Sequence, residues 1–346
     1  MKSFKYNPFF IPSQIFDINR RTYSLTLDVW LGKLIVNRKS LLIVLISLFL
    51  FSCEKNIDID LPDAERKLVV EGSIEPGLPP FVILSKTEGY FAPVDINSFK
   101  NSFIHNAVIN VSNGTSTVQL SEICTDQLDS NMLPLIASLI GVSLQSVNSF
   151  GFCLYTTLDP TMFGEEGKTY SVVIEAEGKT LTSTTTIPVP VVMDSYWYKD
   201  QPGFDDYGYL WFRLKDPQPL GSAYRMYTQR IGKDDRFIPA NGSVFDDNFF
   251  NGLDFEAFIF RGTERGSNSP DDFGDTRSYF KQGDTIAIKF CTIDQPHFQF
   301  WNTFEIAAFN SGNPFAAPAT IKTNIEGGLG VWGGYGVSYD TIVAVD

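Results

Sequence analysis

The chain has 346 residues, of which 19% are charged and 14% are aromatic, and its 30 Phe are far too many for a disordered chain. This length is enough for two ordinary domains. The formal net charge is −13, and residues 1–52 hold seven basic and two acidic residues, so the remainder is near −18. Such an acidic surface repels nucleic acid, and we expect no nucleic-acid partner.

Residues 1–52 have the pattern of a bacterial export leader. Two basic residues precede an apolar run, Leu41–Phe51, which is too short to span a bilayer but suits a signal peptide. Cys53 follows this run directly, behind a small residue, as in a lipobox, where the thiol is acylated and the leader is removed. The pattern predicts a membrane anchor at Cys53. An ordinary secretory leader with an incidental Cys is the alternative.

The segments on either side of the apolar run have different expected roles. Residues 1–35 make the leader unusually long, and we expect them to be an artefact of the assigned start or unstructured. Residues 53–66 are acidic and turn-rich, which is typical of a tether between an anchor and a folded domain.

Residues 67–188 have the pattern of a β-sandwich. Short alternating runs are joined by turns such as Asn113-Gly114 and Glu177-Gly178, which are typical of hairpins. Gly167 and Tyr170 are placed like the corner before a penultimate strand of an immunoglobulin-like sandwich. We therefore expect an immunoglobulin-like first domain.

A helical insertion interrupts this domain at residues 130–149. Apolar residues follow helical spacing there, and Gly141 can end the helix. Cys124 and Cys153 bracket the insertion, and in an exported chain such a pair predicts a disulfide. Two buried free thiols are the alternative.

Residues 189–346 indicate a second β-rich domain, either a sandwich or a partly open barrel. Prolines at 188 and 190 end the preceding sheet and mark the linker. One helix is expected after Asp294, which is placed as its N-cap, with Pro296 in the first turn. Its apolar face should lie against the sheet.

The familiar catalytic patterns are missing from the chain. Its two histidines, His105 and His297, are far apart, and Cys291 alternates within an apolar strand, so we interpret it as a buried thiol. Hydrolase, redox and zinc motifs are absent, so we expect neither an enzyme nor a metal or other cofactor. Acidic loops such as residues 266–276 can chelate calcium, although solvated turns are the simpler interpretation.

Aromatic residues are the remaining candidates for a binding site. Those flanked by Gly or Asp are the better candidates for exposure, and an exposed cluster would stack on sugar rings or peptide side chains. The candidate surface consists of Tyr207, Phe249, Trp332 and Tyr335.

The last two of these residues lie in a glycine-rich stretch, residues 325–339. It contains Gly328-x-Gly330-x-x-Gly333, which matches the dinucleotide-binding spacing. No helix is expected after it, so the glycines are better interpreted as allowing bulges, positive φ or close backbone packing. We also consider the stretch a candidate binding edge.

Three stretches together resemble a bacterial outer-membrane lipoprotein family known as domain of unknown function 4249. They begin near Cys53, at Lys168 and at Gly312, and read "LFSCEKNIDIDLPDAERKLVVEGSI", "KTYSVVIEAEGKTLTSTTTIP" and "GNPFAAPATIKTNIEGGLGVWGGYG". The resemblance implies a location at the outer membrane, facing either the periplasm or the outside. It also implies a partnership with a TonB-dependent transporter, and its lipidated Cys falls on Cys53.

We therefore expect a mainly β, lipid-anchored surface protein that acts as a binding or accessory module for a nutrient transporter. Its ligand would be a glycan or a peptide. A structural or adhesive surface lipoprotein and a carbohydrate-active surface enzyme are the alternatives.

Overall fold

The structure is a computed structural model that describes residues 65–89, 95–264, 269–311, 313, 315–316 and 320–345. All of them belong to one compact unit, Asp63–Asp346. Cys53, the leader and nearly all of the expected tether lie outside the described residues, so the predictions made for them stay predictions.

The largest element is one eight-stranded sheet, which we call the long sheet. Only the pair β1 and β16 is parallel, and the other neighbours are antiparallel. In spatial order its strands are β12 (Ile238–Asp246), β11 (Ala223–Arg230), β15 (Thr285–Ile293), β16 (Leu329–Val343), β1 (Leu68–Ile74), β2 (Phe81–Lys86), β6 (Cys153–Thr156) and β5 (Ser121–Cys124).

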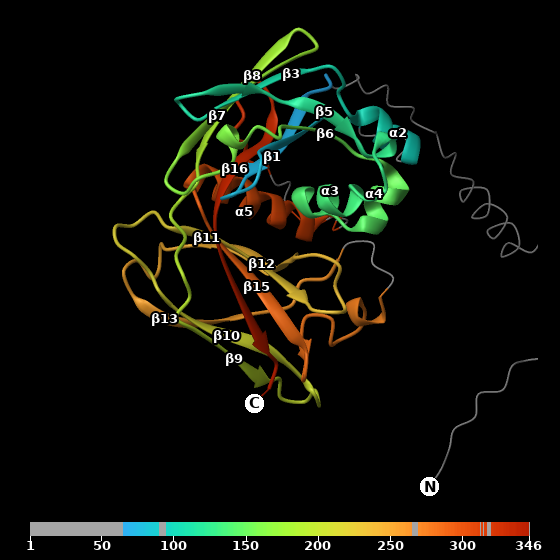
Figure 1. Ribbon diagram of the computed structural model, residues 1–346. Coiled ribbons are helices and arrows are strands. Elements are labelled where there is room, and N and C mark those ends of the chain that lie inside the picture. Colours follow the sequence, from blue (N-terminus) through green and yellow to red (C-terminus); the bar gives the residue numbers. More distant parts are fainter. Residues whose placement is uncertain are drawn as a thin grey trace, which may run out of the picture. The chain divides into compact units, whose positions relative to one another are not determined.

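Strand β16 connects the two halves of the chain. Residues Leu329–Gly334 pair with β1, and residues Tyr335–Val343 pair with β15. Figure 1 shows β16, in dark red, running from the neighbourhood of β1 to that of β15. The glycine-rich stretch, residues 325–339, therefore forms most of a 15-residue strand.

Two smaller four-stranded sheets pack on the long sheet. The first has the order β4 (Thr117–Gln119), β3 (Val108–Ser112), β7 (Thr169–Ala176) and β8 (Lys179–Thr186). The second has the order β13 (Asp254–Ile259), β10 (Tyr207–Lys215) and β14 (Phe280–Lys281), with β9 (Ser195–Asp200) also paired to β10. The mainly β, sandwich-like architecture expected from the sequence is confirmed.

Strand β9 was not foreseen, because its residues follow the prolines that mark the expected linker.

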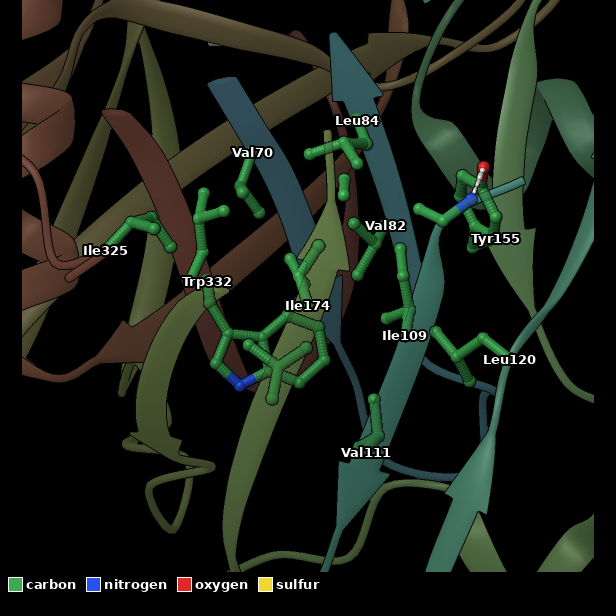
Figure 2. Close-up of a cluster of buried hydrophobic side chains, with 14 of the residues drawn as sticks. Val70, Val82, Leu84, Ile109, Val111, Leu120, Tyr155, Ile174, Ile325 and Trp332 are labelled. Carbon is green, nitrogen blue, oxygen red and sulfur yellow. Dashed lines mark hydrogen bonds between the residues drawn. The ribbon is translucent and has the colours of Figure 1, made fainter. Parts of the chain in front are cut away.

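Each small sheet covers its own apolar core, and both cores lie on the same face of the long sheet. Val70 and Trp332 contribute to the first core, while Ile288 and Phe290 contribute to the second. Figure 2 shows Trp332 among the side chains of the first core. The cores divide near residue 188, as the expected domain boundary does, but Trp332 belongs to the first core and comes from the second expected domain. Because successive side chains of a strand alternate between the two faces of a sheet, the residues between these core positions point to the other face of the long sheet.

The turn before β7 has the geometry expected of an immunoglobulin-like corner. The hydroxyl of Tyr170 donates to the carbonyl of Phe163, at 3.1 Å, and accepts from the N–H of Glu165, at 2.9 Å. Gly167 has a φ of 76°, which favours glycine.

Helices lie outside the sandwiches. Those among the described residues are α2 (Ile96–Ser102), α3 (Leu133–Ile140), α4 (Leu144–Phe150) and α5 (Gln295–Asn310), with 3-10 turns at Thr125–Gln127, Pro160–Met162 and Pro270–Asp272. In the part of the chain that the structure describes, no single helix is long and apolar enough to cross a membrane. The pair α3 and α4 meets these criteria by length and composition only when the two are taken together, across a bend of 107°.

The expected insertion consists of two helices rather than one. Gly141 ends α3 in the left-handed conformation, and the hydroxyl of Ser143 then caps α4 by accepting from the N–H of Ser146. The base of the insertion is closed by a disulfide between Cys124 on β5 and Cys153 on β6, which are direct neighbours in the sheet.

Helix α5 begins where it was expected. The Asp294 carboxylate accepts from the N–H of His297 at 2.9 Å, and its other oxygen accepts from the Thr185 hydroxyl at 2.7 Å. The N-cap therefore also attaches α5 to the end of β8.

Candidate functional site

A groove with a volume of about 2000 Å³ lies on the face of the long sheet that the two small sheets leave open. Its floor comes from β1, β11, β15 and β16. Its walls come from α5, from β12, and from the helices of the insertion together with α2. Residues from both halves of the chain therefore line the groove, and no single stretch of the sequence supplies all of them.

The alternation of each strand decides which side chains reach the floor. On β1, Val70 and Ile74 face the core, so Glu71 and Ser73 face the groove, as does Glu75 directly after the strand. The same alternation brings polar and aromatic residues to the floor from the three neighbouring strands. These are Arg225 and Tyr227 from β11, Lys289 from β15, and Tyr335 and Tyr339 from β16.

Arg225 is the most deeply buried charge on the floor, with 4% of its surface exposed. Its guanidinium lies 3.4 Å from the centre of the Trp301 ring and donates to the Tyr335 hydroxyl at 2.9 Å. Ser243 accepts a longer bond from it and in turn donates to Glu305. Stacking and hydrogen bonds thus hold this cation without a direct ion pair.

Lys289 and Glu75 form an ion pair beside this cluster. The ammonium and carboxylate are 2.6 Å apart, and each side chain is 15% exposed. Burial alone lowers the pKa of Lys289, but the adjacent Glu75 carboxylate outweighs it, so the pKa is raised. Because Glu75 directly follows β1 and Lys289 belongs to β15, the pair joins the two halves of the chain.

Glu71 differs from the other acidic residues of the floor. It has neither a hydrogen bond nor an ion pair with any residue that the structure describes, and its side chain is accessible from the groove. Glu71 is exposed on β1. The protein packed around it raises its pKa, an effect that this exposure limits and that the charge of Arg225 opposes. Glu71 is therefore an incompletely compensated carboxylate that a bound group can reach.

His297 lies at the base of α5, below the groove. Its ring lies flat over Gly333, where an added methyl group would come within 2.2 Å of it, and meets the Tyr335 ring edge-on at 4.5 Å. Burial, followed by the charge of Arg225, lowers the pKa of His297 to about 3. The ring is therefore neutral at pH 7, and its Nδ1 has no partner among the described residues.

The walls of the groove are apolar near the helices. Phe99 and Phe150, with ring centres 5.9 Å apart, are 37% and 39% exposed, and Phe309 on α5 is 88% exposed. The wall is tied together by Arg236, which donates to the carbonyl of Gly141 at 3.0 Å and pairs with Glu264.

One group of possible metal ligands lies away from the groove. The ligand atoms of His105, Glu122, Cys124 and Cys153 are all within 4.8 Å of one another. The two sulfurs are joined to each other, so these four residues would offer thiolates to a metal ion only after reduction.

The four aromatic residues expected to form a binding surface do not lie together on the surface. Trp332 is fully buried, and its indole N–H donates to the carbonyl of Tyr170 at 3.1 Å. Tyr335 is 5% exposed, so the expectation of an exposed pair on a binding edge is wrong. Trp332 is covered by the first small sheet as part of its core, and Tyr335 on the other face is covered by α5 and Arg225. Tyr207 is half-buried, and Phe249 is 94% exposed.

The glycines around them permit close contact between backbones, as expected. A methyl group at Gly330 would lie 1.9 Å from the carbonyl oxygen of Val70, and one at Gly336 would lie 2.0 Å from that of Pro188. Gly330 also has a φ of 105°. The dinucleotide-like spacing thus reflects packing within a strand, and no helix follows it.

A different set of aromatics lies on the outer face of the second small sheet. Trp197 on β9, Trp211 on β10 and Phe258 on β13 are neighbours across these strands, with Phe258 47% exposed. The Lys199 ammonium lies 4.0 Å from the centre of the Trp211 ring. The alternation in "YGYLWFRLK" was the signal for this face, since Tyr209 and Trp211 both fall opposite the buried positions.

Comparison with known proteins supports the resemblance found in the sequence. No curated protein matches the chain. The model of a family described as a domain of unknown function, DUF4249, matches residues 54–341. This match covers all strands of the long sheet in full except the last two residues of β16. The chain therefore belongs to the DUF4249 family.

Proposed function

We propose that this protein is a lipid-anchored binding module of the outer membrane that captures a ligand in the groove and acts with a TonB-dependent nutrient transporter. The observation that carries the binding role is the groove itself, about 2000 Å³ in volume and lined by aromatic and charged side chains. The lipobox-like Cys53 supports the anchor, and the family resemblance supports the transporter.

The chemistry of the groove supports binding more than catalysis. Lys289 is paired with Glu75, and Arg225 is held by stacking and hydrogen bonds. His297 and Cys291 are buried, and burial raises the pKa of the Cys291 thiol to about 12, which disfavours a nucleophilic thiolate. These groups build a fixed surface, and Glu71 remains available to a ligand.

The role of the groove in binding is tested by introducing a large side chain on its floor. Ser73→Trp places a large ring beside Glu71, whereas Thr184→Trp places the same ring on the exposed face of β8, away from the groove. Each full-length variant is purified from detergent-solubilised membranes and tested for binding to a peptide digest and a glycan array. Ser73→Trp should lose binding at least tenfold, while Thr184→Trp should bind as the wild type does.

The same preparations test the partnership. A TonB-dependent transporter should be recovered with the wild type and with both variants, because neither substitution alters the anchor. Equal ligand binding by Ser73→Trp and wild type would overturn the groove as the site. Recovery of no transporter would overturn the partnership, and glycan turnover would favour the enzyme alternative.

A further inference from the structure

We infer that the groove takes a peptide segment that carries a basic group beside apolar side chains. The inference rests on the proposed function, because it names the ligand class of the same site. It follows from the size of the groove, from its charges and from its walls.

The size of the groove indicates a chain-like ligand. Pockets for small molecules are typically about 300–1000 Å³, and this groove is about 2000 Å³. A single sugar or amino acid would leave most of it filled with water. A segment of several residues fits it better, because successive groups can then occupy the floor and both walls.

The charges of the groove favour a basic group at Glu71. Among the described residues lining the groove, Glu75 on the floor is engaged by Lys289, and Glu305 on the α5 wall is engaged by Ser243. Glu71 has no such partner, and it is exposed within the groove. A ligand that displaced the remaining water with an apolar group would leave this carboxylate uncompensated, whereas an ammonium or guanidinium would pair with it.

The lining residues that make no ion pair also give the groove a net negative charge. Asp235 and Arg277 are exposed and make no ion pair with any described residue. Asp95, Glu305 and Arg225 also lack an ion pair with any described residue. With Glu71, the lining residues without an ion pair are therefore four acidic and two basic groups. The groove therefore disfavours an anionic ligand, while Arg277 can accept a carboxylate or a backbone carbonyl of a peptide.

The apolar walls favour a peptide over a simple polyamine as the ligand. Phe99 and Phe150 form one exposed ring cluster with Phe152, whose ring centre is 5.5 Å from that of Phe99. Phe309 and Ile306 are exposed on α5, another wall of the same groove. Exposed rings beside a carboxylate match a ligand in which apolar side chains flank a basic one.

The test uses the full-length protein and a peptide mixture whose basic residues vary. An elastase digest of casein is passed over immobilised wild type, Glu71→Gln and Glu166→Gln, and retained peptides are identified by mass spectrometry. Glu166 is exposed and lies outside the groove, so Glu166→Gln removes the same charge elsewhere. Thermal melting checks that both variants are folded.

Retained peptides should be enriched in Lys or Arg next to apolar residues, and a representative one should bind Glu71→Gln about tenfold more weakly than wild type or Glu166→Gln. Replacing its basic residue by norleucine should cause a similar loss in the wild type and a smaller one in Glu71→Gln. Retention without such enrichment, or retention unchanged in Glu71→Gln, would overturn the inference. A glycan that binds and is excluded by Ser73→Trp would overturn it while leaving the proposed function intact.

Discussion

At the scale of single residues, burial decides what the chemistry-bearing side chains can do. His297 is 1% exposed, so its charged form would lack hydration, and its pKa falls to about 3. Arg225 lies close enough to oppose a second positive charge. A neutral His297 is therefore part of the packing between α5 and β16.

This burial predicts a loss of stability in mild acid. The unfolded chain takes up a proton on this His below about pH 6.5, while the folded chain resists protonation down to about pH 3. The free energy that the neutral His297 contributes to folding is thus complete above pH 6.5 and falls as the pH decreases. Between pH 7 and pH 5 the free energy of unfolding should decrease by about 2 kcal/mol.

Urea denaturation at the two pH values measures this loss. His297→Gln should lower stability at both pH values but remove this part of the pH dependence. His105→Gln, at the half-exposed histidine, should retain it. An unchanged pH dependence in His297→Gln would contradict the assignment.

At the scale of elements, β16 shows why its glycines are needed. Seven consecutive residues of this strand, 330–336, are buried, and backbone atoms of β1 and of the segment after β8 lie against it. The Gly334 N–H donates to the Thr185 hydroxyl, which donates to Asp294. A chain of hydrogen bonds thus joins β16, β8 and the start of α5.

Gly330→Ala should be strongly destabilising for two reasons. Its φ of 105° disfavours any side chain, and the added methyl would lie 1.9 Å from the Val70 carbonyl oxygen. We expect a loss of roughly 3 kcal/mol or more, measured by thermal melting or urea denaturation. Gly89→Ala is the control, since a methyl there meets nothing within 4 Å. A Gly330→Ala protein as stable as Gly89→Ala would show that the strand can shift to accept the methyl.

At the scale of the whole molecule, the two sandwiches share one sheet. The first core contains Trp332 and Ile325 from the end of the chain, and β1 has β16 as one of its two neighbours. The Lys289 and Glu75 pair adds a buried contact between the halves. The groove exists only because these strands lie side by side.

A fragment of residues 67–188, the expected first domain, should therefore not fold by itself. It lacks β16, so β1 would have an unpaired edge, and the site of Trp332 in the core would be empty. Circular dichroism and proton NMR of the fragment, with residues 63–346 as the control, measure this. Cooperative melting of the fragment with dispersed NMR signals would contradict it and would support independent domains.

Patterns within short stretches allowed much of the fold to be predicted. Turn residues between alternating runs indicated the hairpins, Asp294 indicated the start of α5, and Gly141 indicated the end of α3. Turns and helix ends depend on interactions between residues that are a few positions apart, so a short stretch of sequence is enough to predict them. The disulfide was also foreseen, because Cys124 and Cys153 bracket the insertion.

The candidate site could not be predicted in the same way. Glu71 reads as an ordinary exposed residue of an alternating strand, and nothing near it in the sequence shows that it lines a groove. Trp332 reads as an exposed residue among glycines, whereas it is buried. The sequence by itself determined the mainly β class, the start of α5, the end of α3, the hairpin turns and the resemblance to the DUF4249 family. Only the tertiary structure decided that β16 lies between β1 and β15, which buries Trp332 and assembles the groove, because strand pairing over more than 200 residues depends on the packing of whole sheets rather than on local sequence.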